Sequence, residues 1–324
     1  MENPNSSQKE FEELEGKIEK MINTFIKAEK QGKEGTKKYL DWIKEISSPE
    51  FKLISNLLNY FLDDLTSTGM RENIFKILRK LYQLNTEVVA KQIRDNKDFA
   101  KAIIVHINEG DKSQKSDNCF YLLTQLFTTE AYKDEINKEF IKALFDGLGI
   151  VREEEILTAI VVILIDINYK YKSGDNNLFI EVHKENDNSR VLNEILLRVL
   201  NYENDENKQI KILKCLEDLM SNYDKSIFYE SDLESFIDIL IPKLQSTENN
   251  ALKENLLQCL DRVTECNEYY GQMYKVEEII ELIEYFESAE NQSEEARKIS
   301  KQIVTNITNR QGKKSKIYLG DSDD

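Results

Sequence analysis

Apolar residues recur three and four positions apart along almost the whole chain, which is the period of an amphipathic helix. From this spacing we expect helices near residues 8–30, 48–65, 70–84, 86–94, 97–108, 115–128, 137–148, 152–171, 178–185, 189–201, 206–222, 231–246, 250–266, 275–288 and 292–309. The chain holds only 3 Pro and 11 Gly, which leaves little material for hairpin turns. The pattern therefore predicts an all-α protein.

Helices of this length joined by short links favour antiparallel packing of neighbours, and pairs or triplets recur at roughly 40 residues without a sharp sequence repeat. We expect a degenerate armadillo- or HEAT-like helical solenoid that forms a single domain over residues 1–310. The first two helices, with Trp42, would cap it, and residues 311–324 would form a mobile charged tail.

Two local patterns refine the expected helices. Residues 156–167, ILTAIVVILIDI, are too few to span a bilayer and predict a fully buried helix. Ser231 and Glu234 stand at the spacing of a capping box, in which each side chain would satisfy a free amide of the other residue. The KSGDNN segment, 172–177, is the clearest internal loop.

Charge limits the range of partners. The net charge is −16, so a nucleic acid or an anionic membrane surface is a poor partner. Residues 221–290 hold 16 acidic and 5 basic residues, which gives 5 − 16 = −11 for this segment alone. This acidic block is either a solvated face or a means of steering the chain toward a basic partner.

Nothing in the sequence points to catalysis or to a cofactor. The two histidines, His106 and His183, are far apart and are expected to be half-buried or surface residues. The cysteines show no CxxC spacing and are expected to be reduced core residues of a cytoplasmic protein: Cys119, Cys215, Cys259 and Cys266. We therefore predict no catalytic residues, no metal site, no cofactor and no membrane insertion.

A series of short motifs occupies the second half of the chain. In order they are ILIDIN (163–168), VLNYEND (199–205), LEDLM (216–220), FYESDLESFIDI (228–239), and CNEY (266–269) followed by Tyr274-Lys275. Together they resemble the WISH/DIP/SPIN family of activators of the actin-related protein 2/3 complex, over about residues 150–285. Glu230-Ser231 stands where that family has Thr-Asn, and Cys266-Asn267 where it has Asn-Thr.

The resemblance implies a non-enzymatic activator with an armadillo-like fold. Members of the family switch the complex on without a preformed mother filament, which yields linear actin filaments that seed branched networks. They pack on the fourth small subunit of the complex and affect actin only indirectly. The resemblance also implies a cytoplasmic location at cortical actin structures, such as those of endocytosis, and a minimal form without peptide-binding or proline-rich segments.

Residues 225–285 are the candidate partner surface, because the resemblance and the acidic block coincide there. The predicted partner-binding residues are Phe228, Tyr229, Glu230, Asp232, Glu234, Tyr269, Tyr274 and Lys275. Each also has a structural interpretation. The aromatics at 228 and 229 could staple the helix start, and the later tyrosines could pack in the core or a turn. Asp232 could face the helix dipole, and Lys275 could sit in solvent at a helix start.

Two other functions remain open from the sequence. A generic armadillo scaffold or adaptor that binds a partner helix or peptide explains the stack equally well, although no regular Asn ladder is visible. An all-helical enzyme lacks paired DDxxD motifs, because Asp63-Asp64 is followed by Leu65-Thr66-Ser67.

Overall fold

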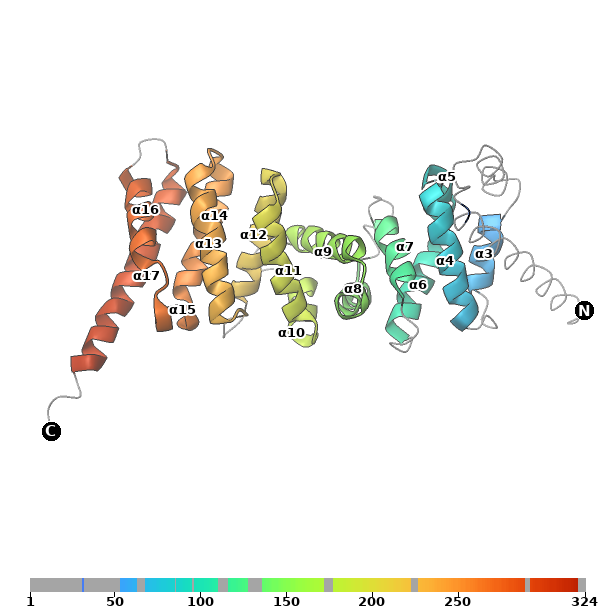
Figure 1. Cartoon of the computed structure of the whole chain (residues 1–324), viewed down its shortest axis with the longest axis horizontal. Coiled ribbons are helices and arrows are strands. Elements are labelled where there is room, and N and C mark those ends of the chain that lie inside the picture. The colour runs from blue at the N-terminus through green and yellow to red at the C-terminus, as the bar shows by residue number, and fades with distance from the viewer. Residues whose placement is uncertain are drawn as a thin grey trace, which may run out of the picture. The chain divides into compact units, whose positions relative to one another are not determined.

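The computed structural model describes residues 31, 53–62, 68–84, 86–94, 96–109, 116–127, 136–171, 177–222, 227–288 and 292–319. These residues form fifteen helices, labelled α3 to α17 in Figure 1, and no strand. The chain divides into two compact units, Met1–Glu135 and Ile136–Asp324. The predicted helix at 8–30 and the capping role of Trp42 fall outside the described residues, and the single domain over 1–310 stays a prediction.

The first unit contains five described helices. They are α3 (Leu53–Leu62), α4 (Thr68–Leu84), α5 (Thr86–Arg94), α6 (Lys97–Glu109) and α7 (Asp117–Phe127). The apolar faces of α3, α4 and α6 meet in an aromatic cluster, in which the Phe61 ring lies 4.9 Å from Phe75 and 5.1 Å from Phe99. His106 packs against two of these rings and is buried, so it is a core residue.

The second unit contains ten described helices. They are α8 (Lys138–Ile150), α9 (Glu154–Tyr169), α10 (Leu178–Glu185), α11 (Ser189–Tyr202), α12 (Glu206–Ser221), α13 (Glu230–Ser246), α14 (Asn250–Glu265), α15 (Asn267–Gln272), α16 (Val276–Ser288) and α17 (Glu294–Leu319). The main contacts of each helix are with helices at most three further along the chain, such as α9 with α12, α11 with α13, α12 with α14, and α14 with α17. This layer-by-layer contact pattern is that of a helical solenoid, so the predicted fold class is confirmed.

Asparagine or aspartate starts several helices of this unit. The side-chain oxygens of Asn137, Asn177, Asp205 and Asn249 accept backbone N–H groups at the first turns of α8, α10, α12 and α14. These short polar side chains satisfy amides that have no partner within the helix. The capping residues in the local sequence therefore determine where these helices begin.

The buried helix predicted over 156–167 is α9, which contacts α8, α10, α11 and α12. Eight of its residues are buried, including Asn168, but Val162 is 43% exposed and residues 157–159 and Asp166 are half-buried, so the prediction of a fully buried helix is wrong at these positions. Elsewhere the predicted helices lie within a few residues of the observed ones. The exceptions are α15, which lies between the helices predicted at 250–266 and 275–288, and α17, which continues to Leu319 into the expected tail.

Candidate partner-binding site

A buried hydrogen-bond network joins two of the sequence motifs. Asn168, at the end of ILIDIN, donates its side-chain amide to Asp218 Oδ2 at 2.8 Å, although the two residues lie 50 positions apart. Asn177 donates to Asn168 Oδ1 at 2.7 Å, and Lys214 pairs with Asp218. Because Asn168 and Asp218 are almost fully buried, these bonds satisfy groups that would otherwise be costly in the core. These motif residues therefore fix α9 against α12.

A second buried pair positions the chain that leads into α13. His183 Nε2 lies 3.0 Å from Asn193 Oδ1, and Asn193 donates its amide to the backbone carbonyl of Ile227 at 3.3 Å. Burial lowers the pKa of His183 to about 4, so its ring is neutral at pH 7. A neutral ring and a carboxamide hold the segment before α13 without placing a charge in the core.

Phe228 and Tyr229 divide the two roles that the sequence left open. Phe228 is 4% exposed and its ring lies 6.0 Å from that of Phe236, so it is part of the core at the start of α13. Tyr229 is 57% exposed. Its hydroxyl accepts a hydrogen bond from Arg190 of α11, and the Arg190 guanidinium lies over its ring, 5.0 Å from the centroid. Tyr229 is thus an aromatic surface residue held in place by a cation–π contact.

The predicted capping box at Ser231 and Glu234 is wrong by two residues. Helix α13 begins at Glu230 with Tyr229 as its N-cap, and Asp232 Oδ2 accepts the Tyr229 backbone N–H at 3.1 Å. Burial of Phe228 fixes where the chain turns into the helix, and this sets the register ahead of any Ser preference. Asp232 therefore has the structural role proposed for it, with its charge at the helix N-terminus.

The turn between α15 and α16 brings three predicted residues together. Tyr269 is buried and donates its hydroxyl to the Tyr274 carbonyl at 3.2 Å. Tyr274 donates to Asp238 Oδ1 at 3.1 Å, and Lys275 Nζ lies 2.9 Å from the same carboxylate. The hydrogen bond that Lys275 donates to the Asp238 carboxylate raises the pKa of Lys275. Met273 and Lys275 have φ values of 51° and 50°, so the turn adopts a left-handed conformation that non-glycine residues seldom take.

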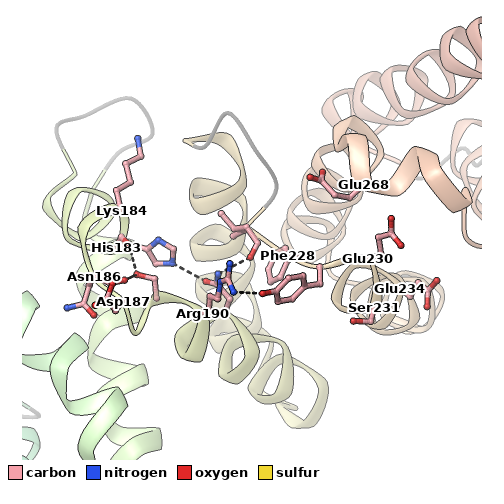
Figure 2. Close-up of a pocket in the computed structure, with 14 residues that line it drawn as sticks. His183, Lys184, Asn186, Asp187, Arg190, Phe228, Glu230, Ser231, Glu234 and Glu268 are labelled. Atoms are coloured by element: carbon pink, nitrogen blue, oxygen red, sulfur yellow. Dashed lines mark hydrogen bonds between the residues drawn. The ribbon is translucent and has the colours of Figure 1, made fainter.

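A groove of about 1210 Å³ opens between α10–α11 and the start of α13 (Figure 2). Lys184 and Arg190 lie on the α10–α11 side, together with Asp187. Its other lining residues are His183, Asn186, Ser189, Asn193, Ile227, Phe228, Tyr229, Glu230, Ser231, Glu234 and Glu268. A smaller hollow, lined by Glu230, Leu233, Glu234, Glu268, Tyr269 and Tyr274, lies beside the groove and shares three acids with it.

The structure thus sorts the predicted site residues. Phe228 and Tyr269 are buried, whereas Tyr229 and Glu230 are exposed at the groove and Glu234 is half-buried there. Asp232 caps α13, and the Tyr274–Lys275 pair lies on Asp238. Whether these residues bind a partner stays a prediction.

The sequence reasoning missed the basic side of the groove. Arg190 precedes Tyr229 by 39 positions and belongs to another helix, so no local pattern connects them. Asp238 and Glu268 were also missed, although both lie within the quoted motif regions. The period of α13 gave one available signal, because positions 230, 234 and 238 fall on one face of a helix.

The described residues offer little for redox or metal chemistry. Within them, no group of three or more His, Cys, Asp or Glu side chains is placed to hold a metal ion. All four cysteines are free. Cys119, Cys215 and Cys259 are buried, as predicted, but Cys266 is only half-buried, so the prediction of a core position is wrong for it. Burial raises the pKa of Cys119 to about 12 and also raises those of Cys215 and Cys259, so these thiols stay protonated. Of the helices in the described ranges, none combines the length and apolar character needed to cross a bilayer.

Fold and site together define a helical-repeat scaffold whose candidate site is a charged surface groove rather than an enclosed pocket. Residues 153–279 match the family model described as "SPIN90/Ldb17, leucine-rich domain". The match confirms, over this region, the resemblance that the sequence motifs predicted. The matched region contains α9 to α15 and the start of α16, and with them the buried network and every lining residue of the groove.

Other comparisons add little. No curated protein sequence is significantly similar to the chain. Two crystal structures of engineered proteins are similar at 15% and 14% identity, with TM-scores of 0.36 and 0.32. They cover 79% and 83% of this chain, and 96% and 71% of the respective engineered chains.

Proposed function

We propose that this chain is a non-enzymatic activator of the actin-related protein 2/3 complex, which starts actin nucleation without a preformed mother filament. The observation that carries the proposal is the family match over residues 153–279, which falls on the ordered motifs. The product would be linear filaments that seed branched networks. The expected contact is with the fourth small subunit, at cortical actin structures in the cytoplasm.

The proposed mechanism is a shift in the populations of two states of the complex. A partner that binds the filament-like arrangement more tightly than the inactive one favours it by that difference in affinity, and tight binding to both states would shift nothing. A rigid binding surface suits this mechanism, because it cannot adapt its shape to fit both states equally well, and it loses little ordering entropy when it binds the state that fits.

Several contacts support rigidity around the candidate surface. The Asn168–Asp218 network ties α9 to α12, and the His183–Asn193 pair ties α10 to α11 and to the entry of α13. Asp238 holds the turn before α16 through Tyr274 and Lys275. A partner would therefore meet side chains that are already positioned.

The proposal is tested with purified complex, actin monomers labelled for fluorescence, and this chain, without any filament seeds. We expect faster assembly with the complex present, no effect on actin alone, and linear filaments at early times under the microscope. Tyr229→Ala serves as the matched variant, because it alters the exposed surface while leaving the core intact. Acceleration that requires added seeds would contradict the proposed mechanism. If the wild-type chain neither accelerates actin assembly nor binds the complex, the activator proposal is wrong, and the scaffold or adaptor function becomes the remaining interpretation.

A further inference from the structure

The groove between α10–α11 and α13 carries opposite charges on its two sides. Lys184 and Arg190 outweigh Asp187 on one side, which gives a net charge of +1 there. Glu230, Glu234 and Glu268 lie on the other side, with a net charge of −3 (Figure 2). This separation is not visible in the sequence, where the whole 221–290 block is acidic and the basic residues of the groove lie outside it.

Arg190 is the residue on the basic side that is best placed to receive a ligand. Its contacts are with Tyr229, which accepts one hydrogen bond and lies beneath the guanidinium. A guanidinium has five N–H donors, and among the described residues none of the carboxylates pairs with it. Arg198, two turns further along the same helix, has Glu154 at 3.7 Å. Arg190 therefore keeps donors directed at a surface where a carboxylate could bind two of them at once.

Tyr229 stands between the two charged sides. Its backbone begins α13, so the ring is fixed at the helix start, and its exposed face borders both Arg190 and Glu230. A rigid aromatic residue flanked by opposite charges is typical of the centre of a protein interface.

We propose that this groove receives a partner segment with separated charges, in which an acidic side chain binds Arg190 and basic side chains face Glu230, Glu234 and Glu268, with Tyr229 between them. The inference rests on the proposed function, with the segment belonging to the actin-related protein 2/3 complex. The inference limits which segment of the complex could bind here. A uniformly basic segment would offer no carboxylate to the remaining Arg190 donors, and its charge would repel that of Lys184. Opposite charges on the two sides also fix the direction in which the segment lies.

The basic side is tested by measuring association and dissociation of the purified complex with Arg190→Glu and Arg198→Glu. Both variants reverse an arginine on α11, but only position 190 lines the groove. We expect about a 10-fold or larger loss of affinity for Arg190→Glu and less than about a 2-fold loss for Arg198→Glu. Arg190→Lys keeps the charge without the planar fork, so its affinity should fall between those of the wild type and Arg190→Glu.

The acidic side is tested with Glu230→Gln/Glu234→Gln and, as a matched control, Glu281→Gln/Glu284→Gln. The control residues are exposed on α16, lie in the same acidic block and line neither the groove nor the hollow beside it. We expect the groove variant to associate about 3- to 10-fold more slowly at low salt, with the difference shrinking as ionic strength rises. Each variant is first checked for an unchanged melting temperature.

The outcomes separate this inference from the function on which it rests. If the groove and control variants lose affinity or association rate equally, the groove is not the binding site. Long-range steering by the whole acidic block would then remain, and the proposed activation would stand. Unchanged affinity for Arg190→Glu, together with slower association of Glu230→Gln/Glu234→Gln, would also overturn it, because the partner would then be uniformly basic. Wild-type chain that does not bind the complex at all would overturn both the inference and the proposed function.

Discussion

Replacing Phe228 and Tyr229 separately by alanine should give opposite results for stability and binding, although the two residues are adjacent. Phe228 is 4% exposed and packs on Phe236, so Phe228→Ala opens a cavity at the start of α13. Large-to-small changes of this kind cost about 3–5 kcal/mol. For a folding unit the size of residues 136–324, that corresponds to a fall in melting temperature of roughly 6–20 °C.

Tyr229→Ala should lower the melting temperature much less than Phe228→Ala does. The side chain is 57% exposed, and its hydrogen bond and cation–π contact with Arg190 lie at the surface, where such contacts are worth about 0.5–1 kcal/mol each. The bond from the 229 backbone N–H to Asp232 survives, because alanine retains that donor. If Tyr229 is an interface anchor, its truncation should weaken binding by about 1–3 kcal/mol, which is roughly 5- to 150-fold in Kd.

The assay is thermal unfolding followed by circular dichroism, paired with titration of the purified complex at a temperature where every variant is folded. Phe228→Ala should then bind in proportion to its folded fraction, and Tyr229→Ala should bind weakly while fully folded. A wild-type melting temperature for Phe228→Ala would refute the packing argument. Unchanged affinity for Tyr229→Ala would remove this side chain from the site.

Four further predictions concern the second unit and the first turn of α4, and all are tested by denaturation. Asp218→Ala leaves a buried amide and an ammonium without their acceptor and should destabilise the protein by about 2–4 kcal/mol in urea unfolding. The pKa of His183 is lowered to about 4, so its contribution to stability is present above about pH 6.5 and is lost as the pH falls toward 4; His183→Asn should flatten this dependence. Burial raises the pKa of Asp261 to about 6, so this carboxyl group costs stability as the pH rises from about 4 to 6. Over that range the free energy of unfolding of Asp261→Asn should increase relative to that of the wild type. The same pH dependence for both proteins would contradict this role of Asp261. Gly149→Ala would place a Cβ against the side-chain oxygen of Asn188 and should destabilise the protein by about 1–2 kcal/mol, whereas the Cβ of Gly69→Ala meets nothing within 4 Å and should stabilise it by about 0.5–1 kcal/mol.

The sequence by itself determined which stretches are helical and where several of them begin. Local signals suffice for this, because apolar spacing selects the buried face and the Asn and Asp caps satisfy the first amides within a few residues. Helices α5 and α10 have the predicted bounds, 86–94 and 178–185. The motif order also indicated the resemblance to the family whose model matches residues 153–279, since the spacing between motifs is itself a property of the sequence.

Tertiary structure alone decided which motif residues are internal and which face solvent. Within one helix start, Phe228 enters the core and Tyr229 does not, although both are aromatic and both precede the helix. The same packing moved the cap of α13 to Tyr229 and away from Ser231. The preference for serine at an N-cap is worth about 1 kcal/mol, and the free energy of burying the Phe228 ring exceeds it.

Contacts between distant residues were likewise beyond the reach of the sequence. Asn168 meets Asp218 across 50 positions, and Arg190 meets Tyr229 across 39, because separate helices are brought together by packing of their apolar faces. The sequence pattern of one helix does not indicate which charged side chain of another helix will lie opposite it. The acidic block was readable in the composition, but its pairing with a basic side, and the groove between them, arise only when α10, α11 and α13 pack.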